Sequence, residues 1–477
     1  MYVGIDVGTS MVKAAAFDAH GRQIAVQARP VALDIRDGFV EQDMDEVYAA
    51  VVDVLAALTA GLDGPVELAG LTGQGDGVWL VDEEGRPVRP AISWMDGRAH
   101  ELLSQWMESG VFTSVFRRTG SAMFPGCPGP VLGWLDRHEP KALDAAATAL
   151  YCKDMVFRRL TGVRATDVSD ASMPFLDPRT RTYDDETLAL LGLGHRRGLL
   201  PPVSDPVAVG ETDGPGLPPG TRIADGPYDL PACALGAGVT RPGDGLLIIG
   251  TCLASLVATD VLDLEGEPAG LYISTDGPGQ WLRAMPAMVG TAALDWVLNT
   301  TGVQHADVDA LLDATPPGSN GVEVLPYFAP SGERAPFVEP RLRAELTGVS
   351  LETTKGDLVR ATCEGIAYAA RHCLEAAGLT GDLAVCGGGT RSPAWMRLFA
   401  DVLGRPLRVV EGEVGARGAV LAAAERYGVP LDVAAWTQPT TVVEPDGARA
   451  ERYGVGYAKH LAELAHARTR ARARAHR

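Results

Sequence analysis

A turn rich in glycine and hydroxyl side chains lies near the start of the chain. It reads Gly8-Thr9-Ser10, follows an apolar run that ends in Asp6, and precedes Lys13. A glycine lets the backbone approach a phosphate closely, and hydroxyl and amide groups can donate hydrogen bonds to it. Asp6 could then hold Mg²⁺ directly or through water, while Lys13 screens phosphate charge. The alternative interpretation is an ordinary hairpin with a solvated aspartate.

The turn Gly250-Thr251 repeats this pattern between the apolar runs 244–249 and 253–259. Two copies about 240 residues apart suggest a duplicated fold in which both turns hold one polyphosphate. Taken singly, the second turn is better explained as a core hairpin.

A run of three glycines, Gly387-Gly388-Gly389, follows an apolar segment, and Ser392-Pro393 comes shortly after it. Serine before proline favours the start of a helix. The glycines would admit a flat ring or a sugar, and a helix N-terminus favours negative charge. Because the run has neither the P-loop nor the Rossmann spacing, we expect a nucleotide site of another type, or a tight turn without a ligand.

Polar side chains close to two tryptophans could line a site for a polyhydroxylated ligand. They are Gln74, Asp76, Asp96 and Arg98, near Trp79 and Trp94. By composition alone, a set of exposed loop charges is the better interpretation.

Asp229 lies between a Gly/Pro-rich loop and an apolar helix start. An aspartate in this position is most often an N-cap. It could also be a general base at a helix N-terminus, a role worth about 10²–10⁴-fold in rate. Both roles can hold at once.

The elements that must position these residues alternate between strands and helices. We expect strands over 2–6, 11–17, 66–72, 77–81, 244–251, 253–259 and 383–386, and helices over 43–58, capped by Asp43, and 357–377. This pattern predicts an α/β fold with function on the loops at the strand ends.

Composition excludes several classes of protein. The 477 residues are 46% hydrophobic and 22% charged, which predicts a well-formed core and two or three domains. A net charge of −19 argues against nucleic acid or a membrane surface as the main partner. Seven cysteines without a C-x-x-C pair, and a start without a signal peptide, predict reduced thiols and a cytoplasmic location.

The motifs together resemble the FGGY carbohydrate kinases, most closely the xylulose kinases and their ketose and polyol relatives. The resemblance runs in order along nearly the whole chain. Its segments are Gly4-Ile-Asp-Val-Gly-Thr-Ser10, Phe39-Val-Glu-Gln-Asp43, Leu71-Thr-Gly-Gln74, Gly85-Arg-Pro-Val-Arg-Pro-Ala-Ile92, Trp94-Met-Asp-Gly-Arg-Ala99, Thr166-Asp-Val-Ser-Asp-Ala-Ser172, Gly250-Thr251, Ser331-Gly-Glu-Arg-Ala-Pro336, Glu364-Gly-Ile366 and Gly387-Gly-Gly-Thr-Arg-Ser-Pro393.

The resemblance implies two ribonuclease-H-like (actin/hexokinase-type) domains with a cleft between them, in which ATP and Mg²⁺ phosphorylate a small sugar or polyol. The spacing of the two turns predicts a domain boundary near residue 245, so that residues 1–244 are the sugar-binding domain and 245–465 the nucleotide-binding domain. The alternating Arg and Ala residues at the C-terminus predict 466–477 as a frayed basic tail. A homodimer is the assembly we consider. The resemblance implies that Asp229 is the catalytic base and that Asp6 binds the metal ion. The first phosphate motif would be Gly8, Thr9, Ser10 and Lys13, the second would be Gly250 and Thr251, and adenosine would bind at Gly388, Gly389 and Ser392. The residues implied to contact the sugar are Gln74, Gly75, Asp76, Asp96, Arg98 and Asp229.

The chain departs from the xylulose kinase pattern at the substrate end. Gly75-Asp76 stands in place of a Met-His pair, and Gly226-Pro-Tyr-Asp229-Leu in place of Gly-Gly-Gly-Asp-Asn. An acid at position 76 could accept hydrogen bonds from two hydroxyls, as suits an L-xylulose-type or erythritol-type kinase. A pentulose is our first expectation, and an erythritol, other polyol or glycerol-type kinase the second. A non-catalytic sugar or nucleotide sensor and an actin-like ATPase are the opposing classes.

Overall fold

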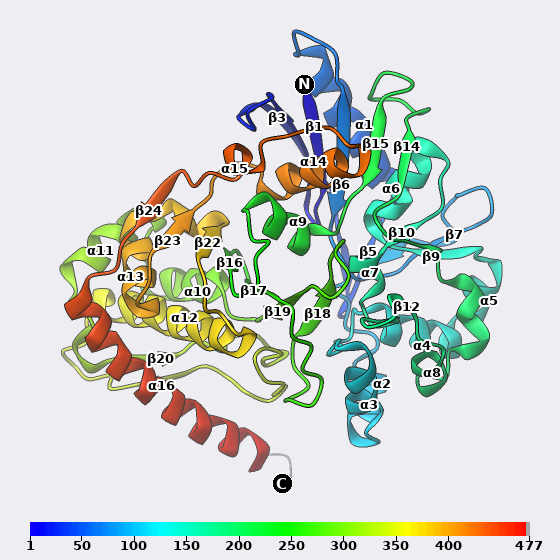
Figure 1. Cartoon of the computed structure of the whole chain (residues 1–477). Coiled ribbons are helices and arrows are strands. Elements are labelled where there is room, and N and C mark those ends of the chain that lie inside the picture. Colours follow the sequence, from blue (N-terminus) through cyan, green and yellow to red (C-terminus); the bar gives the residue numbers. More distant parts are fainter. Residues whose placement is uncertain (474–477) are drawn as a thin grey trace. The chain divides into compact units, whose positions relative to one another are not determined.

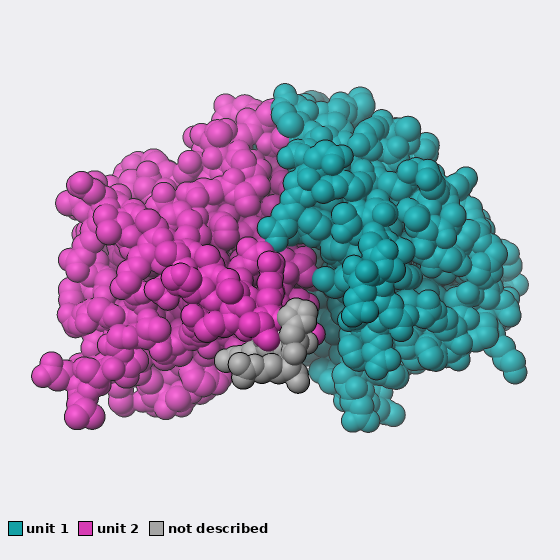
Figure 2. All heavy atoms as spheres, turned by 90° about the horizontal axis from the view of Figure 1, so that it is seen from below, with its two compact units in different colours: residues 1–240, 260–282, 412–438 teal, residues 241–259, 283–411, 439–477 magenta. Residues whose placement is uncertain are grey.

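The computed structural model describes residues 1–473, which form two compact units (Figure 2). Unit 1 comprises Met1–Thr240, Asp260–Leu282 and Gly412–Gln438. Unit 2 comprises Arg241–Thr259, Arg283–Glu411 and the described chain from Pro439 onward. Unit 1 therefore includes two segments from the half of the sequence that we assign to the second domain.

Unit 1 is built on a six-stranded sheet (Figure 1). In spatial order its strands are β14 (Val209–Glu211), β15 (Arg222–Asp225), β6 (Leu68–Gly73), β1 (Tyr2–Val7), β2 (Met11–Phe17) and β3 (Gln23–Pro30). β1 pairs antiparallel with β2 and parallel with β6, and β6 pairs parallel with β15. The carboxyl ends of β1, β6 and β15 thus share one edge, which Asp6, Gln74 and Asp229 follow or adjoin.

Helices cover both faces of this sheet. α1 (Met44–Ala60), capped by Asp43 as predicted, and α6 (Cys152–Thr161) share a core with the side chains of one face. α14 (Val414–Tyr427) covers the other face, close to β1 and β6 (Figure 1). A Cβ on Gly70 would lie 2.1 Å from Ala419 O, so only glycine in β6 permits this approach.

The rest of unit 1 consists of short elements. The strands are β4 (Asp34–Arg36), β5 (Phe39–Gln42), β7 (Trp79–Val81), β8 (Ala91–Ile92), β9 (Thr148–Leu150), β10 (Thr166–Asp167), β11 (Leu176–Asp177), β12 (Thr182–Tyr183), β13 (Val203–Ser204) and β18 (Leu271–Ser274). The helices are α2 (His100–Glu108), α3 (Val111–Thr119), α4 (Pro128–His138), α5 (Pro140–Ala145), α7 (Val168–Ala171), α8 (Asp185–Leu190), α9 (Asp229–Gly236) and α15 (Val433–Trp436).

Unit 2 repeats the strand arrangement of unit 1. In order, its strands are β19 (Trp281–Pro286), β17 (Leu253–Thr259), β16 (Gly245–Ile249), β22 (Leu383–Cys386), β23 (Leu407–Val409) and β24 (Thr441–Val443). β16 pairs antiparallel with β17 and parallel with β22, as β1 pairs with β2 and β6. The predicted duplication of the fold is therefore confirmed.

The helices of unit 2 pack around one hydrophobic core. They are α10 (Thr291–Thr301), α11 (Val308–Ala314), α12 (Lys355–Ala377), α13 (Pro393–Leu403) and α16 (Gly447–Ala473), with the small strands β20 (Glu323–Leu325) and β21 (Glu345–Thr347). The helix expected over 357–377 is confirmed as α12. Residues 466–473 of the expected frayed tail are helical in α16, where Ala467 and Ala471 are buried; residues 474–477 lie outside the described part.

Candidate active site

Asp6 and Asp229 lie close enough in unit 1 for the charge of Asp6 to act on Asp229. Asp6 is in β1 and Asp229 is the first residue of α9, and both are half-buried. Burial raises the pKa of Asp229 to about 8, and the negative charges of Asp6 and Asp76 add to this shift. Burial also raises the pKa of Asp6 to about 6, against the influence of Lys13. Both carboxyls can therefore exchange protons near neutral pH, as acid–base catalysis requires.

The loop that carries Asp229 is fixed at the ends of β6 and α7. Gly226 N donates to Leu71 O at 2.8 Å, and Thr72 Oγ1 donates to Pro227 O at 2.7 Å. Tyr228 N donates to Ser169 Oγ at 3.2 Å. The expected capping role of Asp229 is wrong, because Tyr228 is the N-cap residue and Asp229 occupies the first helical position.

The Gly8-Thr9-Ser10 turn connects β1 to β2 as predicted. Gly8 N donates to Met11 O at 3.1 Å, which closes the turn. Trp94 Nε1 donates to Thr9 Oγ1 at 2.9 Å, so the hydroxyl of Thr9 is held by the loop that carries Asp96. Lys13 forms an ion pair with Glu413 at 3.0 Å, immediately before α14. Asp6, the turn and Lys13 therefore occupy one corner of unit 1.

Gln74, Gly75 and Asp76 follow β6 directly. Gln74 is 2% exposed, its N–H donates to Val7 O at 2.9 Å, and its Nε2 donates to Gln42 Oε1 at 2.8 Å. Asp76 is half-buried with a φ of 58°, a left-handed conformation that aspartate tolerates better than most residues. Its charge raises the pKa of Asp229, which places it on the same side of the unit.

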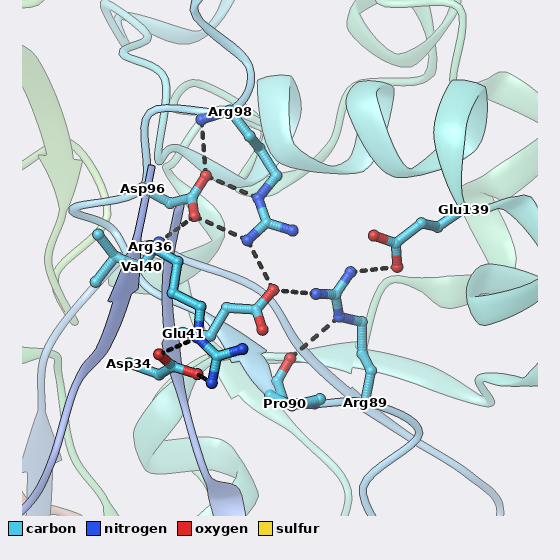
Figure 3. A network of polar contacts seen from close by, with 9 residues as sticks. All are labelled: Asp34, Arg36, Val40, Glu41, Arg89, Pro90, Asp96, Arg98 and Glu139. Atoms are coloured by element: carbon cyan, nitrogen blue, oxygen red, sulfur yellow. Dashed lines mark hydrogen bonds and ion pairs between the residues drawn. The ribbon is translucent and has the colours of Figure 1, made fainter. Parts of the chain in front are cut away.

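Asp96 and Arg98 are buried and belong to a polar network (Figure 3). Arg98 Nε donates to Asp96 Oδ1 at 2.8 Å, and Val40 N donates to Asp96 Oδ2 at 2.6 Å. Arg98 and Arg89 both point at Glu41 (Figure 3). The interpretation of Gln74, Asp96 and Arg98 as exposed loop charges is therefore wrong. The network joins the 94–99 loop to β5.

A buried lysine near the base loop is a feature that the sequence analysis missed. Lys153 Nζ has no solvent exposure and lies 2.7 Å from Asp154, 3.2 Å from Asp167, 3.1 Å from Asp170 and 3.3 Å from Asp225. Burial lowers the pKa of Lys153, but the four carboxylates outweigh this effect and raise it well above its usual value. Burial holds the pKa values of Asp170 and Asp225 well above their usual range.

This lysine joins elements on both sides of the base loop. Asp167 caps α7, which bonds to Tyr228, and Asp225 ends β15, four residues before Asp229. The run 166–172 is the sequence signal that could have pointed to this cluster, because it is one of the segments that carry the family resemblance and its residues have no assigned role.

In unit 2, the structure brings the predicted phosphate turn and the glycine run together. Gly250 and Gly387 follow the parallel neighbours β16 and β22. A Cβ on Gly387 would lie 2.7 Å from Ile249 O, and its φ is 99°, so glycine is required there. Thr291 N donates to Gly250 O at 2.9 Å, which places the start of α10 against the turn.

Gly388 and Gly389, which follow Gly387, differ in the space available around them. Gly388 would have open space around a Cβ, whereas a Cβ on Gly389 would lie 2.2 Å from Ile249 Cγ2. Ser392 caps α13, as predicted, by accepting from Trp395 N at 3.1 Å, and its hydroxyl donates to Asp309. The open face of this site is therefore at Gly388.

Glu333 and Arg334 support the second phosphate turn, a role for which the sequence analysis assigned no residue. Glu333 is 2% exposed and accepts hydrogen bonds from Met288 N and Arg334 N, both at 2.8 Å. Arg334 Nε donates to Pro286 O at 2.9 Å. Because residues 287–291 bond to the strand and turn around Gly250, the two side chains brace that turn.

Within residues 1–473, no cluster of three or more His, Cys, Asp or Glu side chains is arranged to hold a metal ion. In the same part of the chain, no helix combines the length and apolarity needed to span a membrane. The seven cysteines are all free thiols.

Comparison with known proteins places this geometry in a family. Residues 1–212 match the N-terminal domain of the FGGY family of carbohydrate kinases, and residues 246–426 match its C-terminal domain. The chain is 35% identical to an erythritol kinase of Brucella abortus, over 94% of this chain and 93% of the relative. It is 29% identical to a xylulose kinase of Escherichia coli, over 87% of each chain.

Solved structures agree with these matches. The crystal structure of a xylulose kinase from Rhodospirillum rubrum superimposes with a TM-score of 0.88 at 29% identity, covering 98% of this chain and 99% of that one. The predicted two-domain α/β fold and the kinase activity are therefore confirmed. The chain belongs to the FGGY family of carbohydrate kinases.

Proposed function

We propose that this kinase transfers the γ-phosphoryl group of ATP to a hydroxyl of a small ketose or polyol, with Asp229 as the general base. The position of Asp229 carries this proposal. Asp229 is the first residue of α9, and three hydrogen bonds anchor the loop that carries it. Burial and the negative charge of Asp6 raise the pKa of its carboxyl to about 8. A carboxyl that titrates near neutral pH can take a proton from an alcohol as the alcohol attacks.

In the proposed reaction, the substrate hydroxyl oxygen forms a bond to the γ-phosphorus while its proton passes to Asp229. The bond from the γ-phosphorus to the bridging oxygen of ADP breaks. Lys13, the amide groups of the Gly8-Thr9-Ser10 turn and the Gly250-Thr251 turn stabilise phosphate charge. The adenosine part binds at Gly388, Gly389 and Ser392. Gln74 and Asp76 orient the substrate, with Asp96 and Arg98 holding the neighbouring loop.

Asp6 is the residue that we assign to Mg²⁺. Oxygen ligands suit this ion, which usually takes one or two carboxylates together with substrate phosphates and water. A cation beside Asp6 would offset the effect of its negative charge on Asp229. When bound, the ion supplies positive charge to the phosphates.

Two substrate classes have support. The xylulose kinases among the relatives favour a five-carbon ketose of the xylulose type. The relative at 35% identity is an erythritol kinase, which favours a four-carbon polyol, and Asp76 offers a carboxylate suited to two neighbouring hydroxyls.

The test is ATP-dependent ADP release with D- and L-xylulose, D- and L-ribulose, erythritol, threitol and glycerol. We expect one preferred substrate, and a fall in kcat of about 10²–10⁴-fold in Asp229→Asn. The exposed Asp63 supplies the control Asp63→Asn, which should behave as the wild type. Full turnover by Asp229→Asn would refute the assigned base. The homodimer stays a prediction, and light scattering of the purified protein checks it.

A further inference from the structure

Tyr228 is the residue immediately before the proposed base, and its side chain is buried. It is 2% exposed, and its N–H is bonded to Ser169. Its ring packs directly over Gly75: a Cβ at that position would lie 2.6 Å from Cδ2 and 2.9 Å from Cε2 of the ring. The phenol therefore fills the space between the Asp229 loop and the residues that follow β6.

Two buried polar atoms next to this contact lack a hydrogen-bond partner within residues 1–473. They are Tyr228 Oη and Gln74 Oε1, on the two segments that meet at Gly75. Buried polar atoms are almost always paired, because an unpaired one loses its hydrogen bonds to water without replacement. The residue before the base thus carries a hydroxyl that can donate, and the residue before Gly75 carries an amide oxygen that can accept. A polyhydroxylated ligand would satisfy both.

Burial and the negative charges around Tyr228 favour the protonated form of its hydroxyl. Burial raises its pKa well above the usual value, and the negative charges of Asp76 and Asp229 act in the same direction. The phenol thus remains a neutral hydrogen-bond donor throughout the pH range in which Asp229 titrates. It can serve a substrate hydroxyl without competing for the proton that Asp229 takes.

We propose that Tyr228 determines substrate specificity: its hydroxyl bonds to a substrate hydroxyl together with Gln74 Oε1, and its ring limits the site to a short, four-carbon polyol. This inference rests on the proposed function and deepens it. The ring takes up volume beside the base that an additional carbon with its hydroxyl would need. A smaller residue at position 228 would leave that volume free.

The first test separates binding from stability. Tyr228→Phe keeps the ring and removes the hydroxyl, so we expect the KM for the preferred polyol to rise about 10-fold while the KM for ATP is unchanged. Removing an unpaired buried hydroxyl should leave the melting temperature unchanged or raise it. A purely structural tyrosine would show the opposite pattern.

The chain offers two matched controls in unit 2. Tyr327 is also 2% exposed, with a hydroxyl that has no partner among the described residues. Tyr327→Phe should therefore leave the KM for the polyol unchanged and the melting temperature unchanged or raised. Tyr453 is buried and its hydroxyl donates to Glu364 at 2.9 Å, so Tyr453→Phe should lower the melting temperature by about 2–4 °C with no effect on the KM for the polyol.

The second test concerns chain length. In Tyr228→Ala, the ratio of kcat/KM for D-xylulose to that for erythritol should rise about 10-fold over the wild type. The inference is overturned if Tyr228→Phe leaves the KM for the polyol unchanged, or if Tyr228→Ala leaves this ratio unchanged. In either case wild-type turnover would still support the proposed function. A wild type that neither turns over nor binds any sugar in calorimetry would refute both.

Discussion

Lys13 and Glu413 form an ion pair with an Nζ–Oε2 distance of 3.0 Å, although four hundred residues separate them in the sequence. The pair ties β2 to the residue before α14, and both charges act on the pKa of Asp6. With side chains 37% and 21% exposed, such a pair contributes only about 0–1 kcal/mol to stability. The main effect of this ion pair is therefore to fix the position of the Lys13 ammonium group.

Lys13→Met and Glu413→Gln should accordingly have similar stabilities and different kinetics. Each should change the free energy of unfolding by less than about 1 kcal/mol, measured by urea denaturation. Lys13→Met should also raise the KM for ATP about 10-fold, because a charge-assisted bond to phosphate is lost. Glu413→Gln keeps the lysine and should retain the wild-type KM within a few-fold. Equal kinetic loss in both variants would contradict a direct role for Lys13.

Asp229→Asn should stabilise the protein at alkaline pH while it removes activity. The pKa of Asp229 is about 8 in the folded protein and about 4 in an unfolded chain. Between these values the native state binds more protons than the unfolded state, so this carboxyl makes the wild type less stable as pH rises. Asparagine has no charge to bury. The melting temperature of Asp229→Asn should exceed that of the wild type by a margin that grows from pH 5 to pH 8.5. A constant difference over this range would show that the carboxyl keeps its ordinary pKa.

Lys153→Met should destabilise unit 1 by about 3–5 kcal/mol, because it leaves buried carboxylates without the cation that they surround. Asp225→Asn should cost much less, since it leaves Lys153 in place and burial already raises the pKa of Asp225 well above its usual value. Urea unfolding monitored by tryptophan fluorescence measures both changes. If Asp225→Asn is as damaging as Lys153→Met, Asp225 must carry a negative charge in the folded protein.

Gly388→Ala and Gly389→Ala separate a ligand contact from a packing contact. A Cβ on Gly388 meets open space, whereas one on Gly389 would lie 2.2 Å from Ile249. Gly389→Ala should therefore destabilise unit 2 by about 1–3 kcal/mol. Gly388→Ala should leave the melting temperature unchanged and raise the KM for ATP several-fold. An unchanged KM would place the nucleotide elsewhere.

The parts of the fold that the sequence predicted correctly depend on local signals. The β1–β2 hairpin follows from two apolar runs around a glycine turn, and α1 and α13 from the side-chain caps Asp43 and Ser392. The turn at Gly387 could be predicted in the same way, because this glycine lies between an apolar strand and the start of a helix.

What the sequence could not reveal depends on contacts between distant segments. The buried state of Arg98 requires Glu41 and the ring of Phe39, 4.4 Å from its guanidinium carbon. The Lys153 cluster collects aspartates from three segments of the chain, with Asp154 next to the lysine, Asp167 and Asp170 in one run, and Asp225 far along the sequence. Nor does any pattern in residues 414–427 indicate that this helix covers β1 and β6.

The contact of α14 with β1 and β6 determines when unit 1 can complete its folding during protein synthesis. β6 ends at Gly73, but α14, which covers one face of the sheet, ends only at Tyr427. At typical elongation rates, about 20–70 s separate the two on the ribosome. During this interval the nascent first unit exposes an apolar sheet face that the late segment 412–438 covers in the folded protein. A ribosome-bound chain stopped before residue 412 should therefore recruit chaperones, whereas one released after residue 438 should not.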